Sequence, residues 1–281
     1  MSAQAAPEPF FLRLGQGERF CLLHAPAEPQ AAARAAVVFV HAFGEEMNKS
    51  RRMVALQAQA LAAAQCAVLQ IDLLGCGDSS GLLSDASWDA WLADVAGASA
   101  WLGQRYPGAQ RWLWGHRAGC LLAAEAAARD PAPGHLLLWQ PMVAGKTLVQ
   151  QLLRLKAAAG LTDGLPAKSA MAALRAAIAA GQTVEVAGYP LPAKLLNALE
   201  AITLARPAPS SRLRCLDVSP RAGADLSPAT ANLMQAWRDQ GLDVQACVVQ
   251  GPAFWQASEI ETAPALLPAT LAAMDLLAEP A

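Results

Sequence analysis

The sequence lacks any apolar stretch long enough to cross a membrane. Hydrophobic residues make up 54% of its 281 residues and charged residues only 16%. Even so, the longest apolar runs, at residues 35–40 and 136–139, fall far short of the ~20 residues that a bilayer-spanning helix needs. The first nine residues lack a basic stretch followed by an apolar core. We therefore expect neither a transmembrane segment nor a secretory signal peptide.

Charged and metal-binding residues are sparse as well. The net charge is −2 and the basic residues form no stripe, which argues against nucleic acid as a partner. Four histidines are scattered and six cysteines form no CxxC pair, so we expect no metal site. The GxGxxG and Walker patterns are missing, and no cofactor is expected. Cysteines inside strand-like runs are typical of free thiols in a reducing compartment, which predicts a cytoplasmic protein.

What the sequence does contain is a regular alternation of short apolar runs with amphipathic stretches. Runs without polar residues are typical of strands buried on both faces, and the stretches between them carry apolar residues at helical spacing. Strands alternating with helices predict parallel βαβ units. The predicted strands are residues 10–13, 19–24, 37–40, 67–72, 111–114, 136–139, 213–218 and 244–250, and the predicted helices are 51–64, 88–106, 118–129, 229–240 and 265–277.

The alternation breaks between the strands at 136–139 and 213–218. Helical patches joined by glycine and proline fill this interval, with one strand-like run at 183–186. We interpret residues 141–209 as a helical lid inserted into a core formed by residues 1–140 and 210–281.

Four motifs follow predicted strands in a fixed order. They are His41-Ala42-Phe43-Gly44, then Asp72-Leu73-Leu74-Gly75-Cys76-Gly77-Asp78-Ser79, then Gly115-His116-Arg117-Ala118-Gly119, and finally Asp225-Leu226-Ser227-Pro228. With these motifs the chain resembles the α/β-hydrolase superfamily over nearly its full length. The resemblance implies an α/β-hydrolase fold, with a mostly parallel sheet of about eight strands, flanking helices and a helical lid after strand six.

A narrower resemblance is carried by residues 45–53, with the sequence Glu-Glu-Met-Asn-Lys-Ser-Arg-Arg-Met. This segment resembles the second type of hydrolase found with bacterial exosortase A systems. Such systems accompany exopolysaccharide production, so the resemblance implies polysaccharide-synthesis proteins as partners.

The third motif has the frame of a nucleophile elbow, GxSxG, but not its serine. Gly115 and Gly119 keep the frame, and Arg117 stands in the middle. A guanidinium is always protonated in proteins and cannot attack a carbonyl. At the start of a helix the macrodipole also disfavours a cation by ~0.3–1 kcal/mol, so Arg117 needs a compensating partner. The resemblance gives His116 no catalytic role and turns its side chain away from the elbow.

The other catalytic positions are only partly kept. Asp225 stands where the superfamily has its acid, although an N-cap for the helix that follows is the alternative interpretation. The final Gly-x-x-His pattern reads Gly251-Pro-Ala-Phe254, so Phe254 takes the histidine position. The resemblance assigns the oxyanion amides to Phe43 and Ala118, and backbone donors do not depend on the side chain.

Several other side chains near these motifs are candidate site residues. Cys76 is a weak candidate nucleophile, because a thiolate needs a cation and a base nearby. Glu45 and Glu46 are either an acid or base of the site or parts of a solvated loop paired with Lys49, Arg51 or Arg52. Trp255 either lines the pocket or packs in the core, and Ser79 and Ser80 belong to a structural turn.

Two hypotheses on function remain open. In the first, the chain is a catalytically silent α/β-hydrolase fold that binds a small anionic or acylated ligand or a partner protein. In the second, it is a hydrolase or acyl transferase that uses unconventional groups on an ester-like or acyl-sugar substrate. We predict a direct contact between Arg117 and Asp225. The rival is that Arg117 holds an anionic ligand against the Phe43 and Ala118 amides.

Overall fold

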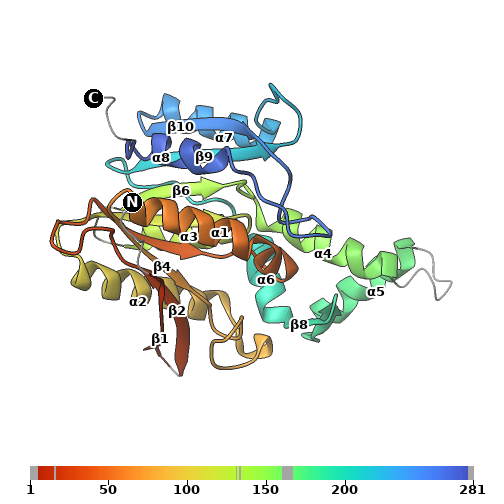
Figure 1. Ribbon diagram of the computed structural model, residues 1–281. Helices are drawn as coiled ribbons and strands as arrows, with labels where there is room; N and C mark the ends of the chain where they lie inside the picture. Colours follow the sequence, from red (N-terminus) through yellow and green to blue (C-terminus); the bar gives the residue numbers. More distant parts are fainter. Residues whose placement is uncertain (1–5, 16, 131, 133, 160–166, 278–281) are drawn as a thin grey trace.

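An eight-stranded sheet forms the centre of the molecule (Figure 1). The computed structural model describes residues 6–15, 17–130, 132, 134–159 and 167–277. The strand order is β1-β2-β4-β3-β5-β6-β9-β10. Strand β2 pairs antiparallel with β1 and β4, and the six strands β4, β3, β5, β6, β9 and β10 are parallel to one another. The strands are β1 Glu8–Arg13, β2 Glu18–His24, β3 Ala35–Val40, β4 Cys66–Ile71, β5 Gln110–His116, β6 His135–Trp139, β9 Arg212–Ser219 and β10 Asp243–Gln250. This is the predicted α/β-hydrolase architecture.

Helices cover both faces of the sheet, which explains the continuous apolar runs of the central strands. Every residue of β3 is buried, because side chains on its two faces enter two different cores. One core lies against α2, α3 and α7, and the other against α1 and α8. These helices are α1 Glu45–Ala63, α2 Trp88–Arg105, α3 Gly119–Arg129, α7 Pro228–Asp239 and α8 Leu266–Ala273.

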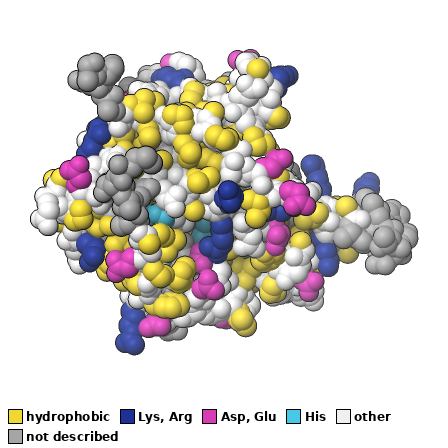
Figure 2. All heavy atoms as spheres, in the orientation of Figure 1, with side chains coloured by type: hydrophobic (Ala, Val, Ile, Leu, Met, Phe, Trp, Pro, Cys, Tyr) yellow, Lys and Arg dark blue, Asp and Glu magenta, His cyan; other side chains and the backbone are white. Residues whose placement is uncertain are grey.

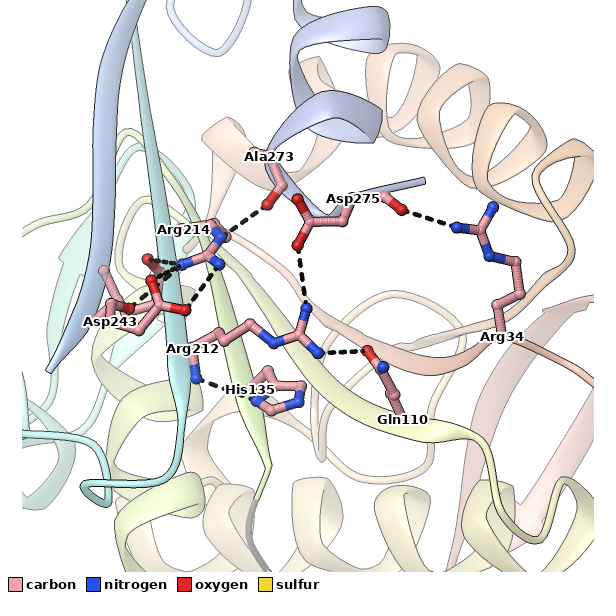
Figure 3. Close-up of polar contacts among 9 residues, drawn as sticks. Arg34, Gln110, His135, Arg212, Arg214, Asp243, Ala273 and Asp275 are labelled. Carbon is pink, nitrogen blue, oxygen red and sulfur yellow. Dashed lines mark hydrogen bonds and ion pairs between the residues drawn. The ribbon is translucent and has the colours of Figure 1, made fainter. Parts of the chain in front are cut away.

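Three arginines bind the C-terminal end of α8 at the side of the sheet where the parallel strands have their N-terminal ends (Figure 3). Arg214 is 2% exposed; its Nε donates to the last carbonyl of α8 at 2.7 Å, and its Nη1 and Nη2 bind the Asp243 carboxylate. Arg212 binds the Asp275 carboxylate, and Arg34 donates to the Asp275 carbonyl. Because the carbonyls at a helix C-terminus carry partial negative charge, these cations stabilise the end of α8.

The segment between β6 and β9 lies outside the sheet. It contains α4 Gly145–Ala159, α5 Ala167–Ala179, β7 Val184–Val186, β8 Tyr189–Leu191 and α6 Ala193–Ala201, and α5 lies at the far right of Figure 1. The strand-like run at 183–186 corresponds to β7, but sequence patterning missed β8 and the hairpin turn, which is formed by Ala187 at φ 49° and Gly188 at φ 84°. Two positive φ angles are typical of a type I′ turn, and Ala-Gly lacks the asparagine that usually signals one.

On the surface, acidic and basic side chains lie interspersed among apolar ones on the face shown in Figure 2. No helix in the described ranges combines the length and the apolar character that crossing a membrane requires.

Candidate functional site

Arg117 sits at the turn between the end of β5 and the start of α3. Its φ is 54°, in the left-handed region that side chains other than glycine rarely adopt. Gly115 and Gly119 flank Arg117, and neighbouring backbone lies too close to each of them for a side chain. A Cβ on Gly115 would lie 2.6 Å from the Cα of Cys120, and one on Gly119 would lie 2.3 Å from the carbonyl oxygen of Val40. The strand–turn–helix geometry is therefore that of a nucleophile elbow, with an arginine at its tip.

The partner of Arg117 is Glu46. Arg117 Nε donates to both carboxylate oxygens at 3.2 Å, and Nη2 donates to Oε1 at 3.0 Å. The two side chains are 10% and 20% exposed. The Trp255 ring lies over the guanidinium, with 5.4 Å from Cζ to the ring centroid. A forked ion pair covered by an indole is a strong arrangement for a cation in a nearly closed site.

The predicted contact between Arg117 and Asp225 is wrong. Asp225 lies exposed in the loop between β9 and α7, and Arg117 turns to α1 instead. Asp225 does not cap α7 either, because the Ser227 side chain accepts the hydrogen bond from the Thr230 amide. Arg117 meets Glu46 rather than Asp225 because of where α1 begins. It begins at Glu45, six residues before the predicted helix, and this first turn brings Glu46 to the elbow.

Glu45 and Glu46 are therefore not part of a solvated loop paired with Lys49, Arg51 or Arg52. Both lie in the first turn of α1, where carboxylates offset the positive end of the helix dipole. Glu45 accepts a hydrogen bond from the Tyr189 hydroxyl at 2.6 Å, which ties the β7–β8 hairpin to α1. Burial, followed by this hydrogen bond to Glu45, raises the pKa of Tyr189 to about 12, so the phenol remains the donor.

Phe254 and Trp255 differ in their surroundings. Phe254 is 1% exposed and stacks on His116, with ring centroids 5.3 Å apart. Trp255, not Phe254, brings an aromatic ring to Arg117 and to the neighbouring pocket.

His116 is fully buried, with Nε2 3.0 Å from the Ser50 hydroxyl. Burial, reinforced by the charge of Arg117, lowers the pKa of His116 to about 3, so its imidazole is neutral.

Cys76 and the serines belong to a structural turn. The Asp72 carboxylate accepts from the Asp78 amide at 3.1 Å and from Arg51 at 3.2 Å, and the Ser79 hydroxyl accepts from the amide of Phe20. Burial, with Asp72 and Asp94 adding to it, raises the pKa of Cys76 to about 12. A thiol that stays protonated is a poor nucleophile, and Cys76 does not line the pocket beneath the lid.

A cavity of about 490 Å³ lies between the lid and the start of α1. This volume suits a small ligand. Neither Arg117 nor Ala118 lines it, whereas Glu46 and Trp255 do, so the ion pair and the indole separate the elbow from the cavity. The lining residues are Phe43, Gly44, Glu45, Glu46, Lys49, Leu148, Gln151, Leu152, Leu155, Val186, Ala187, Tyr189, Leu191, Trp255 and Gln256.

The space beside the oxyanion turn is much smaller. Phe43 and Ala118 border a cavity of only about 20 Å³, closed by Trp91 and Leu199 among others. Such a volume holds about one water molecule and no acyl group. In the described part of the chain, the amides of Phe43 and Ala118 donate no hydrogen bond to protein atoms. A larger groove of about 780 Å³ is lined by α2, α3 and Arg111, away from the loops of the site.

Sequence reasoning missed Asp217, because it lies inside a buried strand, β9, and belongs to none of the motifs. Its side chain is buried, and Oδ1 has no hydrogen-bond partner among the described residues. Burial raises the pKa of Asp217 to about 6, against smaller opposite effects from the Ser227 amide and the charge of Arg117. No cluster of three or more His, Cys, Asp or Glu side chains suited to a metal ion occurs in the ranges that the structure describes.

Comparisons with known proteins agree on the fold. Residues 31–190, more than half of the chain, match the family model of serine aminopeptidase S33. No curated protein matches the sequence.

Several solved structures have the same architecture. Est1E from Butyrivibrio proteoclasticus with bound ferulic acid is 15% identical, with a TM-score of 0.66 over 94% of this chain and 97% of that one. A soluble variant of monoglyceride lipase from Saccharomyces cerevisiae with a substrate analogue is 13% identical, with a TM-score of 0.63 over 98% and 95%. XC6422, a lidless α/β serine hydrolase from Xanthomonas campestris, is 15% identical, with a TM-score of 0.60 over 98% of both chains. At these identities the likeness concerns the fold alone.

Proposed function

The chain belongs to the serine aminopeptidase S33 family of α/β-hydrolases, and we propose that it is a non-hydrolytic member that binds a small ligand beneath its lid. The observation that carries this proposal is the forked pair of Arg117 with Glu46 at the tip of the elbow. A protonated guanidinium has no free electron pair, and its carboxylate partner is engaged by three hydrogen bonds. The arrangement has no nucleophile to form an acyl-enzyme.

The shapes of the two cavities support the same proposal. A hydrolase must place the scissile carbonyl within reach of the nucleophile and both oxyanion amides at once. Here the space beside Ala118 is about 20 Å³, while the ligand-sized cavity of about 490 Å³ stops at Glu46 and Trp255. A ligand in the large cavity is held away from the elbow. Est1E with ferulic acid and the lipase with a substrate analogue are precedents for a ligand held by this fold.

The biological setting that we propose comes from the segment 45–53. Its resemblance to hydrolases associated with exosortase A systems supports an accessory role in bacterial exopolysaccharide production, beside cytoplasmic polysaccharide-synthesis proteins. Two residues of this segment make specific contacts: Glu46 forms an ion pair with Arg117, and Glu45 accepts a hydrogen bond from Tyr189 of the lid.

The second candidate is an active hydrolase or acyl transferase that uses unconventional groups on an ester or acyl-sugar substrate. The unpartnered amides of Phe43 and Ala118 favour it, because they retain the donors of an oxyanion hole. Of the groups beside the cavity, only Glu45 is an exposed carboxylate that could act as a base.

One experiment separates the two candidates. The purified protein is incubated with a fluorophosphonate probe and with nitrophenyl esters from acetate to dodecanoate. We expect no labelling and no turnover above buffer. A turnover number of about 1 per second, the low end for ordinary enzymes, would overturn the non-hydrolytic proposal. Loss of that turnover in Glu45→Gln would establish the second candidate.

A further inference from the structure

Three charged side chains line the cavity beneath the lid, and all three come from the first turns of α1. They are Glu45, Glu46 and Lys49. Glu46 is neutralised by Arg117, and Glu45 is bound by the Tyr189 hydroxyl from the lid. Lys49 has neither an ion pair nor a hydrogen bond within the described residues. The cavity therefore contains one cation whose charge no protein group offsets directly.

The remaining walls of the cavity are mostly apolar. Aromatic rings come from Phe43 and Trp255 on the core side, and aliphatic side chains come from Leu148, Leu152 and Val186 on the lid side. Burying a hydrocarbon or aromatic body against such walls is favourable by roughly 25 cal/mol per Å² of apolar surface. A ligand that satisfies both features has an apolar body and an anionic end.

We propose that the cavity binds a small amphipathic carboxylate, with its apolar body between Trp255 and the lid leucines and its carboxylate at Lys49. This inference rests on the proposed binding function and names the chemical class of the ligand. A carboxylate at Lys49 forms a charge-assisted hydrogen bond in a partly desolvated site, where such bonds are about twice as strong as neutral ones.

Two other classes of ligand fit less well. A neutral alcohol or ester would fill the apolar part and leave the Lys49 ammonium without a counter-charge. A cationic amine would depend on Glu45, whose carboxylate is directed to Tyr189 at 2.6 Å, and would meet Lys49 one helical turn away. Both classes are useful probes, because they change only the end group of the ligand.

The test uses three probes that share one body: 4-phenylbutyrate, 4-phenylbutanol and 4-phenylbutylammonium. Binding to the full-length protein is measured by isothermal titration calorimetry at pH 7.5. We expect the carboxylate to bind about tenfold more tightly than the alcohol, and the ammonium to bind most weakly. In Lys49→Gln the advantage of the carboxylate over the alcohol should disappear, while alcohol binding stays unchanged.

Arg52→Gln is the matched control. Arg52 is exposed on the same helix, three residues beyond Lys49, and does not line the cavity. It removes the same charge from α1 without touching the cavity, so the preference for the carboxylate should persist.

The outcomes distinguish this inference from the proposal on which it rests. Equal binding of carboxylate and alcohol, or an unchanged preference in Lys49→Gln, would overturn the assignment of the anionic end and leave the ligand cavity intact. Tightest binding of the ammonium would overturn it in favour of Glu45. Failure of all three probes to bind at millimolar concentration would contradict the binding function itself.

Discussion

Replacing Glu46 by glutamine would leave the Arg117 guanidinium in a nearly closed site without a counter-charge. The Arg117 side chain is 10% exposed and that of Glu46 20% exposed. Breaking a fully buried ion pair by removing one partner costs about 3–5 kcal/mol. Glutamine keeps one acceptor oxygen, and water reaches part of Glu46, so we expect Glu46→Gln to lower the free energy of unfolding by about 2–3 kcal/mol.

The interaction itself is measured by a double-mutant cycle with Arg117→Met. Methionine has a similar length and no charge, and as another L-residue it meets the same strain at the φ of 54°. Removing both charges should cost little more than removing one, because the second change relieves the charge that the first leaves unpaired. The expected coupling energy is therefore about 2 kcal/mol.

The assay is urea unfolding followed by tryptophan fluorescence and by circular dichroism, with stabilities compared at a common slope. The control cycle uses Arg13 and Glu18, an ion pair whose side chains are 89% and 46% exposed. Its coupling should stay below about 0.5 kcal/mol, because solvent screens an exposed pair. A coupling equally small for Arg117 and Glu46 would refute the buried, forked pair on which the proposed function depends.

Three further predictions concern the elbow, the buried Asp217 and two cysteines. Arg117→Ser alone should remain inactive on nitrophenyl esters, because neither Phe254 nor Trp255 can accept a proton, and an efficient single mutant would disprove this reasoning. The raised pKa of Asp217, about 6 against a usual 3.8, means that the folded state binds this proton more tightly than the unfolded state, so stability falls as the pH rises through that window. Asp217→Asn should therefore gain up to about 3 kcal/mol at pH 7 and almost nothing at pH 4, and an equal effect at both values in urea unfolding would contradict the assignment. Native alkylation with iodoacetamide at pH 8 should modify Cys247 first, because it is exposed and its pKa is raised less than that of Cys76, which burial raises to about 12; early labelling of Cys76 by mass spectrometry would show that its site is open.

The sequence by itself determined the architecture and the identity of the residue at the elbow. Apolar runs such as residues 35–40 can only be satisfied by a strand covered on both faces, and their alternation with helices specifies parallel βαβ units. Gly115 and Gly119 mark the elbow, because the strand and helix approach too closely there for a side chain. These are local requirements of the backbone, and they can be deduced from a short stretch of chain.

The partners of the elbow were decided only by the tertiary structure. Arg117 and Glu46 are 71 positions apart, and no periodicity relates them. The order of the motifs made Asp225 the expected partner of Arg117, but Asp225 lies in an exposed loop. Which carboxylate Arg117 meets depends on where α1 begins. Residues 45–50 include good helix formers such as Glu45, Glu46 and Met47, but Gly44 has no side chain that could cap the helix and mark its start in the sequence. Which carboxylate meets a buried cation is a question of distance in the folded chain, and distance is set by packing.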